Sequence, residues 1–361
     1  MPNSINPAWE LQVSDILPFV SVVLPIRNEG RNIVRCLNAI LAQDYPADRL
    51  EILIADGMST DGTPAIIQQV SKKSSKHTVH LIENTEQNFS HGFNIAVSQS
   101  KGEIILMLGG HTELAPDYIS RGVTHLQSPI IDCVGGVLET IANDPVGQAI
   151  AVGMSSPFGV GGVAFRTTES TDGILEVDTA AFGAYKRDVF KQNGLLDEEM
   201  VRNQDDEFNY RIRSFGCHIY LAHDMRLKYY SRVTFRALWR QYFQYGYWKV
   251  RVLQKHPRQM RLRQFVPPAF VVALFVSVLV AFPPVLRNLS FVLPLFYLLV
   301  NLLASIYTAY KRGWDYLLLL PLVFAILHLS YGSGFLVGLF KFVGRWGDRI
   351  GKVPSYHPIL D

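Results

Sequence analysis

The sequence predicts an α/β domain built around a parallel sheet, followed by a hydrophobic helical region embedded in a membrane. Three observations carry this prediction. Short apolar runs alternate with helical patterns from residue 18 to residue 224, three long apolar runs follow residue 265, and a basic segment separates the two regions. Hydrophobic residues make up 48 % of the chain, and its mean hydropathy of +0.14 is high for a purely soluble protein.

The α/β prediction rests on the order of the expected elements. Short apolar runs predict buried strands at Phe19–Pro25, Leu50–Ala55, Thr78–Ile82 and Glu103–Leu108. Helical spacing or a helix start predicts helices over Gly30–Gln43, from Thr60 to an early Pro64 onward, and over about Ser90–Ser100. Such alternation favours a parallel sheet with helices on both faces, whose ligands bind at the carboxyl ends of the strands. The loops after Leu24, Ile54 and Leu108 are therefore expected to form the site.

The pattern is less regular from residue 132 to residue 224. Gly159–Gly162 is expected to be a flexible loop. Gln204–Phe215 is expected to be a helix with an acidic first turn, and His218–Leu221 a strand.

The C-terminal region contains three apolar runs, and each is long enough to cross a bilayer, which takes about 20 residues. They are Phe265–Phe282, Leu289–Tyr310 and Tyr316–Phe340, and prolines punctuate the first at Pro267, Pro268, Pro283 and Pro284. A buried bundle is the alternative, but so little charge over this length favours spans. Three spans would place the tail outside, whereas its basic residues Lys341, Arg345, Arg349 and Lys352 favour the inside. A re-entrant hairpin or two short spans in the last run would resolve this conflict.

A basic segment precedes the first apolar run. No Asp or Glu occurs from Met225 to Trp314, and eleven basic residues fall between Arg226 and Arg263. Anionic lipid headgroups attract such a segment, which also marks the cytoplasmic side of a membrane. Phe235, Leu238, Trp239 and Tyr242 share one helical face, as in an interfacial amphipathic helix. Packing of that helix against the first domain and a solvated basic linker are the alternatives.

Charge and cysteine content argue against other classes of protein. The net charge of +3 gives no sign of nucleic-acid binding. Cys36, Cys133 and Cys217 fit no metal spacing and no disulfide framework, which indicates a reducing compartment. Residues 1–17 lack the basic start and apolar core of a signal peptide. We therefore expect a multi-pass protein of the inner (plasma) membrane that contacts membrane lipids and keeps its first domain in the cytoplasm.

Two segments near the N-terminus resemble a known family. Residues 20–29 read VSVVLPIRNE, and residues 54–63 read IADGMSTDGT, with a helix expected between them. Together they resemble the opening of the family-2 glycosyltransferases, whose GT-A fold has a Rossmann-like mixed sheet. Later segments are similar to the succinoglycan-biosynthesis subgroup: SSPFGVGG from residue 155, VDTAAFGAYKR from 177, VRNQDDEFNYRIR from 201 and RQYFQYGYWK from 240. The resemblance covers residues 18–340 and implies sugar transfer from a nucleotide-diphosphate sugar.

The donor is expected to bind in the loops after the first two strands. The first of these loops offers Pro25, Arg27, Asn28 and Glu29. A carboxylate such as Glu29 accepts hydrogen bonds from ribose hydroxyls, and Arg27 suits stacking on a base or contact with a phosphate. The resemblance implies that Asp56 contacts the base or ribose, with a turn cap as the alternative, while Asp61 is assigned to the turn.

The end of the fourth strand departs from the family pattern. The resemblance implies two acids there, or Asp-x-His in this subgroup, that hold a divalent cation on the diphosphate. Here the sequence reads Gly109, Gly110 and His111, so Gly109 stands where the first Asp is expected. The two glycines are assigned to the donor site. Three roles stay open for His111: a ligand of Mn²⁺ or Mg²⁺ together with substrate phosphates, a direct donor to a phosphate, or a structural histidine.

The start of the helix at residue 204 is expected to supply the general base. Inverting transfer is one displacement, in which the acceptor hydroxyl loses its proton as it attacks the anomeric carbon. The family's Glu-Asp pair matches Gln204 and Asp205, so the resemblance makes Asp205 the base, with Gln204 and Asp206 near the acceptor. The alternative is that acids gather at a helix N-terminus because the macrodipole favours them.

Three further residues are candidates for phosphate or acceptor contacts. Arg166 and Lys186 suit a diphosphate or a lipid phosphate, with a merely solvated role as the alternative. Residues 244–248 resemble the Gln-x-x-Arg-Trp motif of processive synthases, but Tyr247 stands in the Arg position. Trp248 is expected either to stack near an acceptor sugar or to anchor the chain at the membrane interface.

The expected protein is a membrane-associated inverting glycosyltransferase that extends a polyprenyl-linked glycan in exopolysaccharide biosynthesis. Its expected segments are an N-terminal extension (1–17), a GT-A catalytic domain (18–230), a basic amphipathic segment (231–264), a transmembrane region (265–340) and a basic tail (341–361). Two alternatives stay open. One is a polyprenyl-phosphate sugar synthase, and the other is a nucleotide-sugar-binding membrane partner without turnover, which the missing Asp at position 109 motivates.

Overall fold

The computed structural model describes residues 17–74, 76–162, 165, 173–230, 234–349 and 351–358. These residues divide into two compact units. We call residues 17–139, 173–229 and 351–358 the sheet unit, and residues 140–165 and 230–349 the helical unit. The division differs from the expected segments at two places, because residues 140–165 group with the C-terminal helices and residues 351–358 group with the sheet.

The described residues form a nine-stranded mixed sheet with the order β3-β2-β1-β4-β8-β6-β9-β5, in which β7 pairs with β9. The four expected strands are confirmed and are parallel: β1 (Val20–Ile26), β2 (Leu50–Asp56), β3 (Thr78–Glu83) and β4 (Ile104–Met107). The other strands are β5 (Thr112–Leu114), β6 (Cys133–Ile141), β7 (Ile174–Glu176), β8 (Ala184–Lys186) and β9 (Ile219–Tyr230). β9 starts where a strand is expected and then runs on, because its residues alternate between buried and exposed positions.

The helices of the sheet unit follow the sequence patterns closely. They are α1 (Ile33–Leu41), α2 (Thr63–Lys73), α3 (Phe89–Gln99), α4 (Tyr118–Leu126), α8 (Arg187–Asn193) and α9 (Gln204–Ser214), with the short 3₁₀ turn η1 (Ala47–Arg49). α1 buries Ile33, Leu37 and Ile40 at helical spacing. α2 begins after Gly62, whose φ of 84° lies in the left-handed region that glycine adopts without strain.

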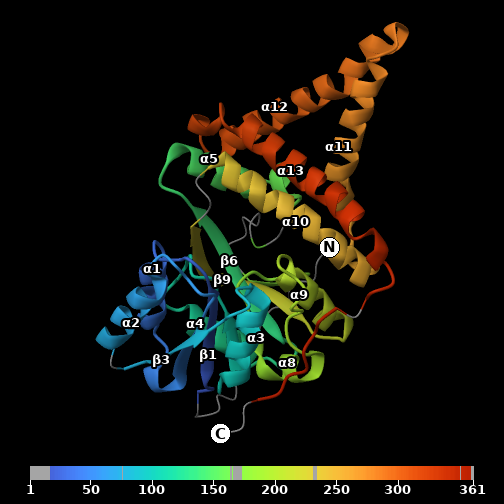
Figure 1. Ribbon diagram of the computed structural model, residues 1–361. Helices are drawn as coiled ribbons and strands as arrows, with labels where there is room; N and C mark the ends of the chain where they lie inside the picture. Colours follow the sequence, from blue (N-terminus) through green and yellow to red (C-terminus); the bar gives the residue numbers. More distant parts are fainter. Residues whose placement is uncertain are drawn as a thin grey trace. The chain divides into compact units, whose positions relative to one another are not determined.

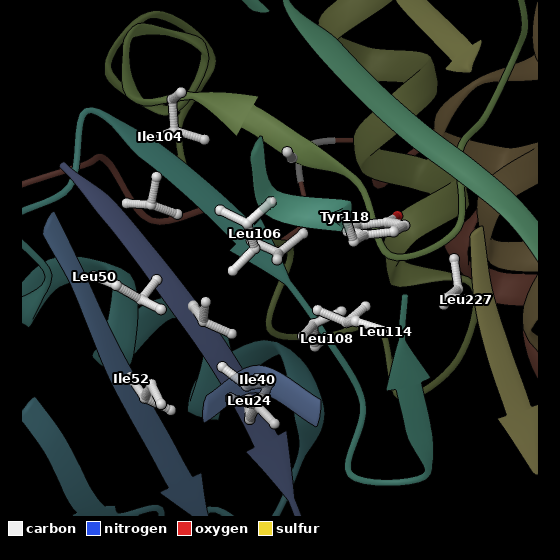
Figure 2. Packing of buried hydrophobic residues seen from close by; sticks show 14 of the residues in the cluster. Leu24, Ile40, Leu50, Ile52, Ile104, Leu106, Leu108, Leu114, Tyr118 and Leu227 are labelled. Carbon is white, nitrogen blue, oxygen red and sulfur yellow. The ribbon is translucent and has the colours of Figure 1, made fainter. Parts of the chain in front are cut away.

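The core of the sheet unit lies under the expected site. Figure 2 shows Leu24 on β1, Leu50 and Ile52 on β2, and Leu106 on β4 packing together with Ile40 of α1. These side chains are almost completely buried, so the carboxyl ends of the strands rest on a close-packed support.

The helical unit contains α5 (Pro145–Met154), α6 (Pro157–Val160), α10 (Phe235–Lys255), α11 (Leu262–Val280), α12 (Val292–Arg312) and α13 (Leu320–Lys341). Short 3₁₀ segments are η2 (Pro257–Gln259), η3 (Pro284–Phe291), η4 (Trp314–Tyr316) and η5 (Val343–Arg345). In Figure 1, α11 and α12 (orange) form the two legs of a hairpin, and α13 (red) runs beside α10 (yellow). Within the described ranges, three helical segments are long and apolar enough to cross a membrane: Leu262–Val280, Pro284–Arg312 and Leu320–Lys341.

The expected loop at Gly159–Gly162 is wrong at its first two residues, which belong to α6. Gly159 lies against the backbone carbonyl of Gly153, where a side chain would not fit, so this glycine allows close helix packing and does not act as a hinge. The helix ends at Gly161, which has a φ of 72°.

Candidate functional site

The three expected site loops lie side by side. β1 pairs with β2 so that Ile26 lies opposite Asp56, and β1 pairs with β4 so that Val23 lies opposite Met107. Just beyond the strands, the Gly57 nitrogen donates to the Ile26 carbonyl at 2.8 Å. The loops that follow β1, β2 and β4 therefore leave the same edge of the sheet, which is where parallel sheets bind ligands.

The loop after β2 is held in shape by Asp56. One carboxylate oxygen accepts from the Ser59 nitrogen at 2.9 Å, and the other accepts from the Ser59 hydroxyl at 2.6 Å. The Ser59 hydroxyl oxygen accepts from the Asn28 nitrogen at 2.8 Å, and the Asn28 side-chain oxygen accepts from the Thr60 nitrogen at 2.9 Å. Asn28 has a φ of 55°, which asparagine tolerates better than most residues. Asp56 thus caps a turn that also fixes the neighbouring loop, and its contact with a base or ribose remains a prediction.

Asp61 ties the same two loops together a second time. Its carboxylate accepts from the Gly30 nitrogen at 2.9 Å and from the Thr63 nitrogen at 3.1 Å. The hydrogen bond from the Thr63 hydroxyl is the main reason why the pKa of Asp61 lies below its usual value. The structural role expected for Asp61 agrees with this geometry. Arg27 is exposed at the same edge, and Pro25 lies within β1 opposite Ala55.

Glu29 reaches from the first loop to His111 in the loop after β4. Its Oε1 accepts from His111 Nδ1 at 2.9 Å, and its Oε2 accepts from the Asn32 side chain at 3.1 Å. Because a carboxylate only accepts, Nδ1 carries the proton, and Nε2 is then the ring nitrogen with a lone pair. Gly110 makes this approach possible, since a Cβ there would lie 2.8 Å from Cγ of Glu29. Glu29 is therefore a partner of His111, and its predicted contact with ribose remains untested.

Ring atoms of Phe182 and His111 lie close to Gly109, where the resemblance predicts an Asp. A Cβ at Gly109 would lie 3.2 Å from Cε1 of Phe182 and 3.5 Å from Cε1 of His111. The His111 ring meets Tyr229 edge-on at a centroid distance of 4.9 Å, and Phe182 stacks on Tyr229 at 6.2 Å. Phe182 has a φ of 52°, an uncommon conformation for a bulky residue. Sequence reasoning missed Phe182 and Tyr229, because nothing local marks residues so far apart in the chain as neighbours.

The donor set of this loop bears on the divalent cation that the fold family implies. Among the residues that the structure describes, no group of three or more His, Cys, Asp or Glu side chains is arranged to hold a metal ion. His111 nevertheless has the arrangement of a metal-ligating histidine, whose second ring nitrogen donates to a carboxylate. The residues present therefore fit a cation that takes one protein ligand and completes its shell with phosphate oxygens and water.

The three acids in the first turn of α9 have different surroundings. Glu207 is buried and pairs with Arg211 at 2.9 Å, and Arg211 in turn donates to the Leu195 carbonyl at 2.7 Å. Asp205 accepts from the Asp206 nitrogen at 2.9 Å. Both Asp205 and Asp206 are half-buried and lie at the helix N-terminus. Glu207 is thus a structural residue, whereas Asp205 and Asp206 remain the candidates for contact with substrate.

Hydrogen bonds link α9 with Tyr185 and with the segment that leads to Phe182. Burial is the main reason why the pKa of Tyr185 lies well above its usual value, and the negative charge of Asp205 adds to the shift. One turn after Asp205, the Asn209 side chain accepts from the Tyr185 hydroxyl at 2.8 Å and donates to the Thr179 hydroxyl at 2.7 Å. The segment from Thr179 to Phe182 therefore connects α9 with the surroundings of Gly109.

The remaining candidates differ in their surroundings. Lys186 lies opposite Ile104, at the other end of β4, and donates to the Ser128 carbonyl at 2.8 Å, while burial lowers the pKa of its ammonium. Trp248 lies on α10 in the helical unit and packs near Tyr247 and Phe342. Arg166 lies outside the described residues. Gln204 begins α9, and its side-chain oxygen is buried without a hydrogen-bond partner among the described residues.

Residues 21–194 match the sequence profile of glycosyl transferase family 2. This chain carries a family-2 glycosyltransferase domain. The match begins within β1 and ends just after α8, so it contains the loops after β1, β2 and β4 and stops before α9.

The glycosyltransferase domain and the helices that follow it have curated relatives. The chain is 25 % identical over 329 residues to the dolichyl N-acetyl-alpha-D-glucosaminyl phosphate 3-beta-D-2,3-diacetamido-2,3-dideoxy-beta-D-glucuronosyltransferase of Methanococcus voltae, which covers 90 % of this chain and 98 % of that protein. It is 26 % identical over 250 residues to the succinoglycan biosynthesis protein ExoA of Rhizobium meliloti, which covers 69 % of this chain and 74 % of that protein. The predicted resemblance to the succinoglycan-biosynthesis glycosyltransferases is thus confirmed.

A solved structure confirms the fold of this glycosyltransferase. The mannosyltransferase PcManGT of Pyrobaculum calidifontis, solved in complex with GDP-Man and Mn²⁺, aligns over 91 % of this chain and 88 % of its own, with a TM-score of 0.56 and 18 % identity. At this identity the likeness shows the fold alone, which is the GT-A fold that the sequence predicts.

Proposed function

We propose that this protein is a membrane-associated inverting glycosyltransferase that moves a sugar from a nucleotide-diphosphate sugar to a lipid-linked glycan during cell-surface polysaccharide synthesis. The observation that carries this proposal is that the acids in the first turn of α9 have different surroundings. Glu207 is committed to Arg211, while Asp205 lies at the helix N-terminus within a family-2 glycosyltransferase fold. The lipid-linked acceptor is supported by the Methanococcus voltae relative, whose name specifies a dolichyl-phosphate-linked acceptor and whose similarity extends over 90 % of this chain.

In the proposed reaction, one bond forms as another breaks. The acceptor hydroxyl oxygen attacks the anomeric carbon from the face opposite the nucleoside diphosphate, whose oxygen leaves with the bonding electrons. Asp205 accepts the hydroxyl proton, so no charge builds up on the attacking oxygen. The loops after β1 and β2 hold the nucleotide, with Arg27 and Asn28 at their exposed edge. The hydrogen bonds of Asp56 and Asp61 keep these loops in one shape before the donor binds, which lowers the cost of ordering them.

The proposed cofactor is a divalent cation, Mn²⁺ or Mg²⁺. His111 is the residue that would hold it, and Glu29 would orient the imidazole. When bound, the cation offsets negative charge on the diphosphate leaving group. Imidazole favours transition metals over Mg²⁺, so we expect Mn²⁺ to support activity better.

The proposal is tested with the full-length protein in detergent, a panel of nucleotide sugars and a polyprenyl-linked sugar acceptor. We expect one donor to be consumed with release of a nucleoside diphosphate, and nuclear magnetic resonance to show an inverted anomeric configuration in the product. Asp205→Asn is the matched inactive control.

Other outcomes would replace the proposal. A lipid monophosphate sugar as the product would identify a polyprenyl-phosphate sugar synthase. Donor binding without consumption, with every acceptor tested, would identify a nucleotide-sugar-binding partner without turnover. A retained anomeric configuration would contradict the inverting mechanism.

A further inference from the structure

The C-terminal tail is part of the sheet unit. The Leu195 nitrogen donates to the Pro354 carbonyl at 2.9 Å, and the Glu198 nitrogen donates to the Lys352 carbonyl at 2.9 Å. The Lys352 nitrogen donates to Oδ1 of the buried Asp197 at 2.9 Å. These three hydrogen bonds hold residues 352–354 along the segment that precedes α9. The tail must therefore lie on the same side of any membrane as the glycosyltransferase site.

The chain between α13 and the docked tail is too short to recross a bilayer. From Lys341 to Lys352 a fully extended chain spans at most about 40 Å. A bilayer with its headgroup regions is about 40–45 Å thick. The connection is also not extended, because it contains the 3₁₀ turn η5 at Val343–Arg345. The C-terminal end of α13 therefore lies on the same side of any membrane as the docked tail.

The same end of α13 is fixed to the charged end of α10. The Gln254 side chain donates to the Phe342 carbonyl at 2.7 Å. Arg251 is fully buried, donates to the Gln254 side chain at 2.6 Å and pairs with Asp348 at 3.4 Å. An ionic network of this kind is costly inside hydrocarbon, so this end of the helix pair does not lie in the middle of a bilayer.

α13 also differs from the other two apolar helices in what covers it. Half of its apolar window is buried within the protein, against 6 % for Leu262–Val280 and 17 % for Pro284–Arg312. Gly334 lies against the backbone of Phe243 in α10, and Gly338 lies against that of Tyr247. Much of the apolar surface of α13 is thus covered by protein, including α10, an amphipathic helix that carries Arg236, Arg240 and Lys249.

The exposed apolar side chains gather instead on α11, η3 and α12. Large exposed residues occur along this hairpin, among them Phe275, Leu279, Leu289, Leu295 and Phe296. α11 has 19 residues, which gives about 28 Å at 1.5 Å per residue, close to the thickness of the hydrocarbon core. Both ends of the hairpin are basic, with Arg261 and Arg263 at its start and Lys311 and Arg312 at its end. Basic flanks at both ends favour entry from, and return to, the same cytoplasmic face.

We propose that, among the residues that the structure describes, only the α11–η3–α12 hairpin enters the bilayer and returns, and that α13 does not cross it. The exposed apolar surface of the hairpin faces lipid hydrocarbon, while α13 stays packed on α10 and shares the membrane side of the sheet unit. The two ends of the hairpin, the loop before α13 and the C-terminus then all share the side of the glycosyltransferase site. This arrangement resolves the conflict between three apolar runs and a basic tail, and it does not depend on which sugar the enzyme transfers.

Single cysteines labelled with a membrane-impermeant maleimide test this topology. Cys36 and Cys133 are buried, so a Cys217→Ser background leaves little native labelling. Glu86→Cys reports the membrane side of the sheet unit, and Asn288→Cys reports that of the hairpin tip. Asp315→Cys reports the side of the loop before α13, and Gly344→Cys reports the side of the turn after it. All four positions are exposed. Sealed vesicles of both orientations are labelled, and the full-length chain without cysteine substitutions, carrying a tag after Asp361, is treated with protease in the same vesicles.

We expect Glu86→Cys, Asp315→Cys and Gly344→Cys to react in vesicles of one orientation, and the tag to be removed in that same orientation. Asn288→Cys should be protected there, whether the tip ends within the bilayer or emerges on the far side. Opposite sidedness of Asp315→Cys and Gly344→Cys would show that α13 crosses and would overturn the proposal. So would labelling of Asn288→Cys together with Glu86→Cys, or a tag protected when Glu86→Cys is labelled.

Discussion

The first turn of α9 and the loop after β4 differ in where their carboxylates come from. α9 brings three acids together and assigns one, Glu207, to a buried ion pair with Arg211. The loop after β4 has no acid at positions 109–111, and the carboxylate beside His111 comes from Glu29 in another loop. The difference teaches that a site can lose a residue at its usual position in the chain and still place the same type of group nearby. The proposed base should therefore be sensitive to a single substitution, while the His111 loop should respond to changes in two loops.

The largest expected effect is at α9. Asp205→Asn removes the proposed base and keeps the shape of the side chain, so turnover should fall by about 10²-fold or more. Donor affinity, measured by calorimetry, should change little, because the donor loops are elsewhere. Asp206→Asn is the matched control and should keep most of the activity. Loss of activity in Asp206→Asn with a normal Asp205→Asn would place the base one residue later, and normal activity in both would leave only the helix-dipole explanation.

The next largest effect is expected at Glu29. Glu29→Gln keeps a similar size but removes the charge that fixes the proton on His111 Nδ1. Loss of such a carboxylate behind a metal-ligating histidine costs about 10- to 100-fold in metal affinity. The Mn²⁺ concentration needed for half-maximal donor binding should rise accordingly. An unchanged Mn²⁺ requirement would show that the Glu29–His111 pair is structural.

A smaller effect is expected when an acid is restored. Gly109→Asp places a Cβ about as close to the Phe182 ring as packing allows, at 3.2 Å, so the single variant should bind the donor no better than the parent. Gly109→Asp with Phe182→Leu gives the carboxylate room, and we expect donor binding to become several-fold stronger with Mg²⁺. Phe182→Leu alone is the control. An unchanged donor affinity with Mg²⁺ in the double variant would show that the space taken by the Phe182 ring is not what prevents an acid at position 109 from strengthening donor binding.

The smallest expected effect lies outside both regions, at Asp224 on β9. Burial opposes its ionisation, but hydrogen bonds from His125 and Arg121 lower the pKa of Asp224 to about 2. Its ionised form is therefore favoured in the folded protein, so its stabilisation is present above about pH 4 and disappears as the pH falls through 2. The side chain is 38 % exposed, which limits the contribution to about 1 kcal/mol or less. Asp224→Asn should lower the melting temperature of the full-length protein slightly at pH 7 and much less at pH 2. An equal decrease at both values would show that the contribution is not ionic.

Much of the sheet unit could be predicted from the sequence, because its strands and helices leave local signals. β1 and β2 are buried along their whole length, and α1 repeats its apolar residues at helical spacing. The loops after β1, β2 and β4 could be predicted as the site for the same reason, since strand ends in a parallel sheet meet at one edge. These features require only the order of elements and a general rule.

The rest depends on tertiary structure. Nothing in the chain marks Phe182 as a neighbour of Gly109, and the fact that Lys186 lies at the opposite end of β4 follows from strand register alone. Hydropathy likewise does not separate α13, whose apolar window is half buried within the protein, from α11, whose window is only 6 % buried. An apolar run shows that a helix avoids water, but not whether protein or lipid covers it.

Donor affinity with and without a chelator, in wild type and His111→Ala, tests most directly the claim that His111, oriented by Glu29, does the work of the missing acid. Binding is measured with the full-length protein by calorimetry, so the result does not depend on turnover. We expect the chelator to weaken donor binding in the wild type and to have little effect in His111→Ala, whose affinity should already be low in the presence of Mn²⁺. Equal sensitivity to the chelator in both proteins would contradict the claim, and so would a wild type whose donor affinity the chelator leaves unchanged.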